Sequence, residues 1–573
     1  MRFGYRAFVV LLSLSWTAPT LGTEILTYLP QNTLGFALVR DAQKTNDKIA
    51  AFVEIFERGV PGPLDLAMAV TGLASGLDVQ GDALFALLPA AEAGALPTPM
   101  FLLPVTDYTL IAESITADTT GEICRVTIAN EDVLVAQHGK FALLMNVEHR
   151  ALMQQLLTTE RVIPPAIATN QQWIIDNDVV TLVTSAGIMY LKQMAQAEHH
   201  SPQSEHLADP FSEPPLATRM LQIGRSLPLA DLVAHEVTLA GAGVAIDDDI
   251  NARFRWLVKF QEPRPEAATP KSAEKPFLGF AEKPYAVAAT GSLPAEFATT
   301  VPELFTALAR KTAAQDGRAD FTDEDWADER TTHELWVQGL KNVSLLLTPG
   351  KEGEPMLSIL FARLSVDDSQ AYLEALKQLF ALSNKLDART KSDIKFNFQV
   401  APVTIAEAEG FEATCDFDLA TGDGNNIPWQ AFLTSLLGVD HKLSLYFCAS
   451  DEHQIFFAME SQEKLSAFIE AYRNQDTGLM TTTPVKTTIE LLGAEAPWTG
   501  LVNPQGIVEL VHTALKSVQI LGMAIEFPPY PPAPPLGIVF DGQQTHWQGE
   551  MVMPVEAARA MAKFSDDLQA AFR

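Results

Sequence analysis

One pattern recurs along this chain of 573 residues: a short apolar strand, a polar capping residue and an amphipathic helix. Residues 100–112 share the pattern with residues 356–368, and residues 141–152 share it with residues 455–465. An apolar run followed by apolar positions at helical spacing indicates a strand that enters a helix. Because both halves repeat this order, we expect an α+β fold of two related lobes, each a mostly antiparallel sheet backed by helices, that arose by internal duplication.

A third pair of matching segments supports the division of the chain into two related halves. Residues 179–183 enter a helix that contains Gly187, and residues 498–502 enter a helix that contains Gly506. A stretch rich in proline and poor in large apolar residues follows the first half and is typical of a linker. The sequence therefore predicts four segments: a signal peptide at 1–22, an N-terminal α+β lobe at 23–262, a Pro-rich linker at 263–276 and a related C-terminal α+β lobe at 277–573.

The first residues have the composition of an export signal. Arg2 and Arg6 precede an apolar run that ends at Trp16, and small residues follow as far as Gly22. The alternative is a retained membrane anchor, but the apolar run is shorter than the ~20 residues that span a bilayer core. We expect cleavage after Gly22 and an exported protein, periplasmic, envelope-associated or extracellular, without stable membrane insertion.

The charge balance limits the partners. The chain has 71 acidic and 40 basic residues, a formal net charge of −31. A broad nucleic-acid interface requires a basic stripe, and adsorption to anionic lipid requires a basic surface. We therefore expect no nucleic-acid partner, and we attribute the acidity to solubility rather than to a dedicated cation site.

The chain has three cysteines, Cys124, Cys415 and Cys448, which are too few for a disulfide framework. Two interpretations remain open. Cys415 and Cys448 lie in neighbouring strand-like runs and would pair if those strands were adjacent. Otherwise all three are buried thiols that act as small apolar residues.

An aspartate recurs where a strand gives way to a helix, at Asp107 and at Asp367. A short carboxylate at this position accepts hydrogen bonds from the first free N–H groups of the helix and complements the helix dipole. We interpret both residues as helix caps rather than as catalytic groups.

No recognisable catalytic motif occurs in the sequence. A nucleophile elbow, a zinc-binding His-Glu-x-x-His, a phosphate-binding loop and a dinucleotide-binding glycine motif are all missing. Two segments resemble cation sites: the polar loop with His199, His200, His206 and Asp209, which we interpret as solvated, and residues 247–249, which we interpret as an acidic hairpin turn. The acidic residues 321–329 indicate a solvated helix start or loop. We therefore assign no catalytic, cofactor-binding or metal-binding residue and no cofactor.

Three further segments carry a resemblance to a known group. They are PQNTLGFALVRD at residues 30–41, PGPLDL at 61–66, and PPLGIVF at 534–540 followed by MPV at 553–555. With them the chain resembles secreted bacterial proteins of planctomycete type that carry a duplicated domain of unknown function. The resemblance implies export and a bilobed α+β fold. It implies no activity, because its motifs are turns, caps and strand starts.

These observations favour an exported, non-enzymatic protein that binds a partner or ligand through its sheet faces or between its lobes. The partner is then an unidentified protein or an apolar ligand. A carrier of an apolar ligand is the first alternative, because lobes rich in Phe, Leu and Val can enclose a groove. A hydrolase with dispersed catalytic residues is the second.

Overall fold

The chain forms two compact units in a computed structural model. The first contains residues 1–225, 230–263 and 545–550, and the second contains the remaining residues. The expected signal segment, the linker and the loop with His199 to Asp209 lie outside the described residues. The structure describes residues 24–56, 62, 64, 68, 75–90, 96–115, 121–128, 131–198, 237–261, 277–280, 284–293, 297–313, 318, 320–349, 359–390, 394–419, 442–492, 496–518, 526–543 and 545–571.

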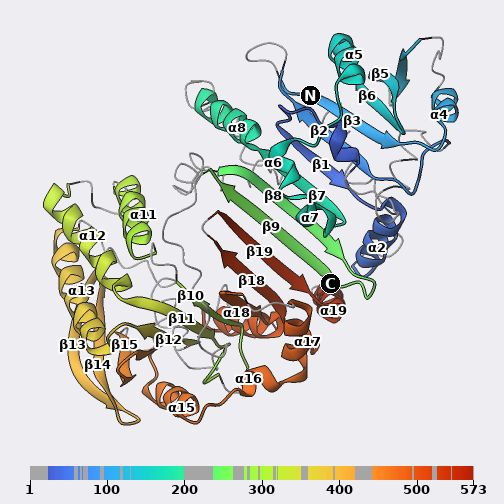
Figure 1. Ribbon diagram of the computed structural model, residues 1–573. Helices are drawn as coiled ribbons and strands as arrows, with labels where there is room; N and C mark the ends of the chain where they lie inside the picture. The colour runs from blue at the N-terminus through green and yellow to red at the C-terminus, as the bar shows by residue number, and fades with distance from the viewer. Residues whose placement is uncertain are drawn as a thin grey trace. The chain divides into compact units, whose positions relative to one another are not determined.

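The first unit is built on a sheet whose neighbouring strands are all antiparallel (Figure 1). Its strand order is β4-β5-β6-β3-β2-β1-β7-β8-β9. The strands are β1 (Gly35–Val39), β2 (Ala83–Leu88), β3 (Thr98–Pro104), β4 (Ile123–Ile128), β5 (Glu131–His138), β6 (Phe141–Asn146), β7 (Val179–Thr184), β8 (Val237–Ile246) and β9 (Ala252–Phe260). The helices are η1 (Ile25–Tyr28), α2 (Ala42–Glu54), α4 (Tyr108–Ser114), η2 (Val147–His149), α5 (Arg150–Thr158), α6 (Pro165–Ala168), α7 (Gln171–Ile175) and α8 (Ser185–Glu198).

Helices cover both faces of this first sheet. Successive residues of a strand point to opposite faces, so neighbouring residues pack against different helices. On β3, Leu102 belongs to the apolar cluster that includes η1, α5, α6 and α7. Its neighbour Leu103 belongs to a second cluster that includes Ile111 and Ile115 at α4. The near-continuous apolar strands of the sequence therefore reflect burial on both faces.

The second unit repeats this construction. Its strand order is β13-β14-β15-β16-β12-β11-β10-β17-β18, again antiparallel throughout the pairs described. The strands are β10 (Val287–Ser292), β11 (Leu340–Leu347), β12 (Leu360–Val366), β13 (Ile394–Ile405), β14 (Ala408–Leu419), β15 (Lys442–Asp451), β16 (Gln454–Met459), β17 (Trp498–Val502) and β18 (Leu536–Gly542). The helices are α11 (Phe297–Thr312), α12 (Asp323–Val337), α13 (Ser369–Arg389), α15 (Gln462–Arg473), α16 (Gly478–Thr481), α17 (Thr483–Leu492), α18 (Pro504–Val518) and α19 (Val555–Ala571).

The second sheet is also buried on two faces. Phe456 lies in the cluster that includes α15, and its neighbour Phe457 lies in the cluster that includes α13. In Figure 1, α12 and α13 run side by side beside β13 and β14. The prediction of an α+β fold with antiparallel sheets and backing helices is confirmed.

A segment from the end of the chain belongs to the first unit. Residues 545–550 include the start of β19 (His546–Met553), which pairs with β9. The amide of Phe260 donates to the carbonyl of Thr545 at 3.0 Å. Glu550 binds two arginines of β9, with Arg253 Nη1 at 2.8 Å and Arg255 Nε at 2.6 Å. These contacts fix residues 545–550 to the first unit.

The strand register decides whether Cys415 and Cys448 form a disulfide. Strands β14 and β15 are adjacent, but Cys415 lies opposite Leu443 and Cys448 lies opposite Gly410. Their Cα atoms are thus several residues apart along the strands, farther than the ~7 Å limit for a disulfide. All three cysteines are buried thiols, so the pairing of Cys415 with Cys448 is wrong. Among the described helices, none combines the length and apolarity needed to cross a bilayer.

Candidate functional site

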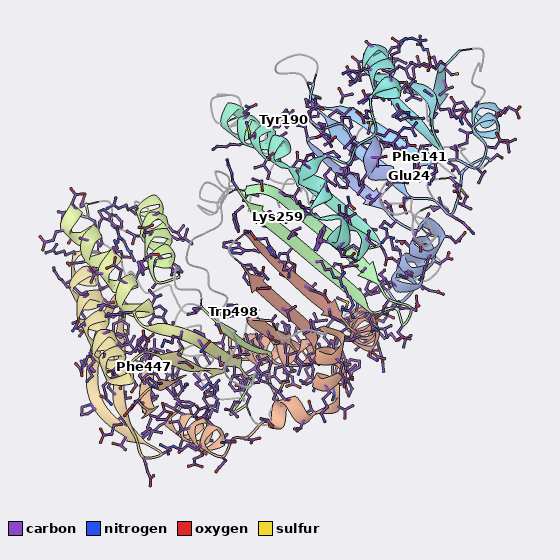
Figure 2. All side chains as sticks on the ribbon, in the orientation of Figure 1. Glu24, Phe141, Tyr190, Lys259, Phe447 and Trp498 are labelled. Carbon is purple, nitrogen blue, oxygen red and sulfur yellow. The ribbon has the colours of Figure 1, made fainter. Side chains whose placement is uncertain are left out.

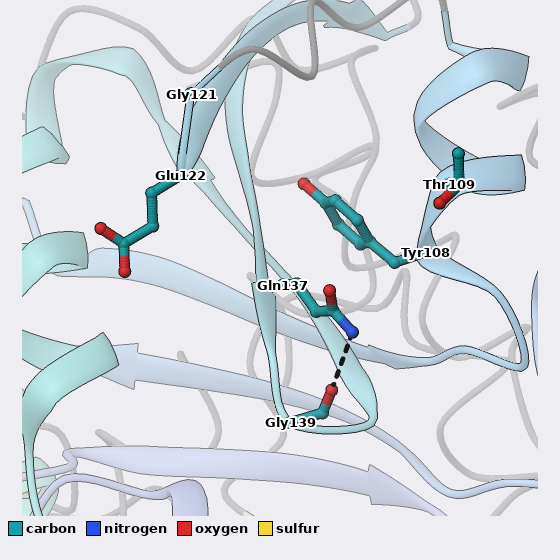
Figure 3. A pocket seen from close by; sticks show the side chains of 6 residues that line it. All are labelled: Tyr108, Thr109, Gly121, Glu122, Gln137 and Gly139. Atoms are coloured by element: carbon teal, nitrogen blue, oxygen red, sulfur yellow. Dashed lines mark hydrogen bonds between the residues drawn. The ribbon is translucent and has the colours of Figure 1, made fainter.

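A pocket of about 600 Å³ opens beside α4 in the first unit (Figure 3). Three elements line it: the start of α4, the entry to β4, and the end of β5 with the turn that follows. The lining residues are Tyr108, Thr109, Gly121, Glu122, Gln137 and Gly139. The pocket is therefore assembled from segments that meet only because β4, β5 and α4 pack together.

The start of α4 is held by its cap. Asp107 Oδ1 accepts a hydrogen bond from the amide of Thr109 at 2.8 Å, as the capping interpretation predicts. Just before the cap, the amide of Thr106 donates to Gly76, a glycine with φ +83°. This fixed entry directs Tyr108 and Thr109 toward the pocket.

The opposite wall depends on register. Ile123 pairs with Ala136, so the preceding residue, Glu122, faces Gln137 across the two strands. The turn between β5 and β6 contains Gly139 with φ +65°, where a Cβ atom would overlap the hydroxyl of Tyr28. Glycine is required there both for the backbone conformation and for the close approach.

Tyr108 is the most unusual group of the pocket. Its hydroxyl is buried, and the thiol of Cys124 lies within its reach. Burial, and then the neighbouring Cys124 thiol, raise the pKa of Tyr108 above its ordinary value, so the phenol stays neutral. In Figure 3 the ring extends from α4 toward β4.

The remaining polar groups point to hydrogen bonding. The Gln137 amide donates to the carbonyl of Gly139 at 3.3 Å, which leaves its own carbonyl oxygen as an acceptor (Figure 3). Glu122 is exposed and takes part in no ion pair within the described part of the chain. Arg161 lies behind Gly139 and is engaged with Tyr28, donating to its hydroxyl at 2.7 Å. The lining thus presents one carboxylate and several neutral donors and acceptors.

A second polar cluster lies where β1, β2 and β7 meet α2. Asp41 has φ +51°, and its amide donates to Asp82 Oδ1 at 3.2 Å. Burial raises the pKa of Asp41 to about 6, opposed by Lys44 and reinforced by Asp178, and burial also raises the pKa of Asp82. Asp178 binds Lys48 at 3.2 Å and accepts from the Ile246 amide at 2.7 Å. These contacts tie α2 to the sheet.

The second unit contains a buried arginine. Arg363 on β12 is only 2% exposed, donates to Ser344 Oγ at 3.3 Å and lies 4.9 Å from the centre of the Tyr472 ring. Ser344 in turn bonds Thr290 at 2.8 Å. In the first unit, the same register position across β1, β2 and β3 holds leucines: Leu38, Leu84 and Leu102. The two units therefore differ in this cross-strand row, which is polar in the second unit and apolar in the first.

The acidic residues singled out in the sequence have structural roles. The capping interpretation of Asp367 is wrong by one residue: Asp368 caps α13, accepting from the amide of Ala371 at 2.9 Å, whereas Asp367 pairs with Lys341. Asp247 accepts from the amides of Asp249 and Asn251 in the β8–β9 turn. Within residues 321–329, Thr322 and Asp325 form a capping box at the start of α12.

No group of three or more potential metal ligands occurs within the described ranges, which do not include His199, His200, His206 and Asp209. Sequence reasoning missed Tyr108 and Glu122. One local signal concerns each residue. The cap at Asp107 starts the helix that carries Tyr108, and the alternation of β4, continued back by one residue, puts Glu122 on the face of Cys124.

Comparison with protein-family models, with curated proteins and with solved structures gives no match for this chain.

Proposed function

We propose that this chain is an exported, non-enzymatic binding protein of bacterial origin, built by internal duplication, whose first unit holds a pocket for a polar ligand. The observation that carries the proposal is the pocket beside α4, whose described lining includes the polar side chains of Tyr108, Glu122 and Gln137. Fold alone would not support a function, so the proposal rests on this site.

Duplication is supported by matched hydrogen bonds at matched strand positions. The amide of Thr184 donates to Leu34 at 2.9 Å, and the amide of Asn503 donates to Ala286 at 2.8 Å. Both bonds join the end of the strand that pairs with a unit's first strand, β7 or β17, to the residue before that first strand. The order β4-β5-β6-β3-β2-β1-β7-β8 of the first unit also corresponds to the order β14-β15-β16-β12-β11-β10-β17-β18 of the second. The second unit has β13 in addition.

The chemistry of the lining supports binding rather than catalysis. Among the lining residues that the structure describes, Glu122 is the one carboxylate, whereas glycoside hydrolysis ordinarily uses two. Tyr108 does not serve as a base, because its raised pKa keeps the phenol protonated. The polar lining also makes this pocket unsuited to the apolar ligand of the alternative hypothesis.

The test is a ligand screen with a matched pair of tyrosine variants. Purified protein is screened against a library of small polar metabolites by thermal shift, and hits are measured by calorimetry. Tyr108→Phe keeps the ring but removes the hydroxyl, so we expect affinity for a pocket ligand to fall about tenfold. Tyr190→Phe, on α8 as labelled in Figure 2, is the control and should leave affinity unchanged.

Two results would overturn the proposal. One is a set of hits that bind Tyr108→Phe and the unaltered protein equally well. The other is turnover of an ester, peptide, phosphate or glycoside substrate that a single substitution abolishes.

A further inference from the structure

We infer that two copies of this chain associate through β4, the outer strand of the first sheet, which pairs antiparallel with β4 of the second copy. Within the described residues β4 pairs only with β5. In the second unit, β14 has the corresponding place in the strand order and pairs on its outer side with β13. The second sheet therefore has an antiparallel strand at the position where the described part of the first sheet has an open edge.

The helix beside each edge differs in the same sense. In the second unit, the 21-residue helix α13 reaches β13, where the rings of Phe380 and Phe398 lie 4.8 Å apart. The corresponding helix of the first unit, α4, has 7 residues and packs on β4 itself, with Ile111 in one apolar cluster with Val126 and Ile128. Within the described residues, the first unit thus has no counterpart of β13 or of the part of α13 that packs on it.

The two outer strands also differ in their protection against association. On β13, Asn384 bonds both backbone groups of Phe398, and Pro402 has no amide hydrogen to offer. Proline and covering side chains are among the devices by which proteins block a strand edge. Strand β4 has neither proline nor lysine, and its residues 126–128 are all β-branched, which favours strand pairing. The edge of β4 is therefore suited to accept a further strand.

The register between β4 and β5 determines which backbone groups point outward. Ile128 lies at the start of a two-residue connection to β5, and residues that close such a turn are hydrogen bonded to each other. Because bonded and non-bonded pairs alternate in an antiparallel ladder, Ile123, Arg125 and Thr127 direct their N–H and C=O groups to the outer edge. The Ile123 carbonyl accepts from Arg150 at 3.4 Å. Arg125 and Thr127 then carry the outward groups that a partner strand can bond.

One register suits the pairing of β4 with itself. When Val126 lies opposite Val126 of the second copy, Arg125 lies opposite Thr127, and these two residues exchange both of their outward backbone hydrogen bonds. A pair centred on Arg125 would instead place like charges opposite each other. In the Val126 register, Arg125 faces a neutral residue and keeps its ion pair with Asp132 of its own chain. The apolar face toward α4 also stays on one side of both strands.

The experiment is sedimentation velocity on the purified full chain. An edge of 6 residues buries less than the ~1,200 Å² of a standard interface, so we expect a weak dimer with a Kd on the order of 10 µM. The net charge of −31 opposes association, and about 0.15 M salt screens it to a Debye length of about 8 Å. Across about 1–100 µM the monomer should convert to a dimer.

A matched pair of variants at Thr127 tests the edge. Thr127→Pro removes the outward amide hydrogen, and an edge strand tolerates proline where the nitrogen faces solvent. Thr127→Val keeps the amide hydrogen and the branched shape, and both variants lose the same side-chain bond to Asp132. We expect Thr127→Pro to raise the Kd about tenfold or more and Thr127→Val to leave it unchanged. Circular dichroism checks that both variants are folded.

A cysteine in place of Val126 tests the register. At the centre of a non-bonded pair the two Cα atoms lie about 4.5 Å apart, which is within the range for a disulfide. Mild oxidation of Val126→Cys should therefore give a covalent dimer on a non-reducing gel. Thr127→Cys is the control and should remain monomeric on the gel, because its residue lies opposite Arg125 and not opposite itself.

Three results would overturn the inference. The first is a chain that stays monomeric across the whole concentration range, even if β4 binds a strand of another protein. The second is equal association of Thr127→Pro and Thr127→Val. The third is the absence of a Val126→Cys cross-link under conditions in which the unaltered chain dimerises. The ligand screen with the Tyr108 variant tests the proposed function separately, so either idea can fail while the other stands.

Discussion

Asn384 on α13 hydrogen bonds to both backbone groups of Phe398 on the edge strand β13. Its Nδ2 donates to the Phe398 carbonyl at 2.8 Å, and its Oδ1 accepts from the Phe398 amide at 2.7 Å. The side chain thus takes the place of a further strand at this position. Since an unpaired strand edge is a template for association between molecules, Asn384 protects the second sheet where the extra strand β13 ends it.

Replacing Asn384 by Ala should remove both bonds and leave two edge groups without a protein partner. We expect the free energy of unfolding to fall by about 1–3 kcal/mol and the variant to aggregate more readily on mild heating. Denaturant unfolding and light scattering measure the two effects. Asn397→Ala, at the exposed neighbouring position of β13, is the control, and an equal loss in both variants would contradict the role given to Asn384.

Gly187 and Gly506 should both resist substitution, because each packs directly against a backbone carbonyl. A Cβ atom on Gly187 would overlap the carbonyl of Leu34, and one on Gly506 would overlap the carbonyl of Tyr285. Alanine ordinarily stabilises a helix relative to glycine, yet here we expect each substitution to destabilise its unit by about 1–3 kcal/mol. Gly500→Ala, whose nearest neighbours lie at 3.9 Å, should be tolerated. Thermal unfolding distinguishes the three variants, and stabilisation by either helical alanine would refute the packing described.

Glu460 should make stability depend on pH. Burial chiefly, with the nearby Glu412, raises its pKa from 4.5 to about 7, while the Ser444 amide opposes the shift. Between these values the unfolded chain has released a proton that the folded chain retains, so the free energy of unfolding falls as pH rises through this window. Because Glu460 is only half-buried, solvent screening keeps the loss below about 3 kcal/mol.

The Glu460→Gln variant isolates this effect, because its amide oxygen still accepts from Ser444. It should be more stable than the unaltered protein above about pH 7, and the difference should vanish below about pH 4. Urea unfolding across that range tests it, and parallel stability curves for the two proteins would rule the effect out.

The three thiols should be unreactive while the protein is folded. All are buried, and burial raises the pKa of Cys448 to about 11, so little thiolate exists at neutral pH. A thiol reagent should label Cys124, Cys415 and Cys448 only after denaturation, as counted by mass spectrometry. A mass two protons lower in the non-reduced chain would reveal a disulfide and contradict the strand register.

The elements were predictable because apolar strands and helical spacing are local signals. The cap at Asp107 followed from its place between an apolar strand and a helix. The corresponding cap of α13 was predicted at Asp367, one residue too early. Asp367 and Asp368 are adjacent, and only the backbone conformation decides which of them precedes the first turn of the helix. Local sequence also could not decide the pairing of Cys415 with Cys448, since that depends on the offset between two strands.

The candidate site could not be predicted from the sequence, because it too depends on how distant segments pack. Tyr108 and Glu122 lie on either side of the α4–β4 connection, and Gln137 comes from another strand. They share a cavity only because the β4–β5 register and the packing of α4 bring them together. The role of Arg363 was equally unpredictable, since its strand has the pattern of an apolar run and nothing nearby in the sequence marks Ser344 as its partner.

The membership of residues 545–550 in the first unit has a consequence for the order of folding. A chain made from its N-terminus displays β9, with Arg253 and Arg255, long before Glu550 exists. During synthesis the first sheet therefore has an open edge and two basic side chains that lack their carboxylate. Completion of the first unit waits for residues 545–550, so a nascent chain that lacks them can associate with other molecules through the open edge of β9.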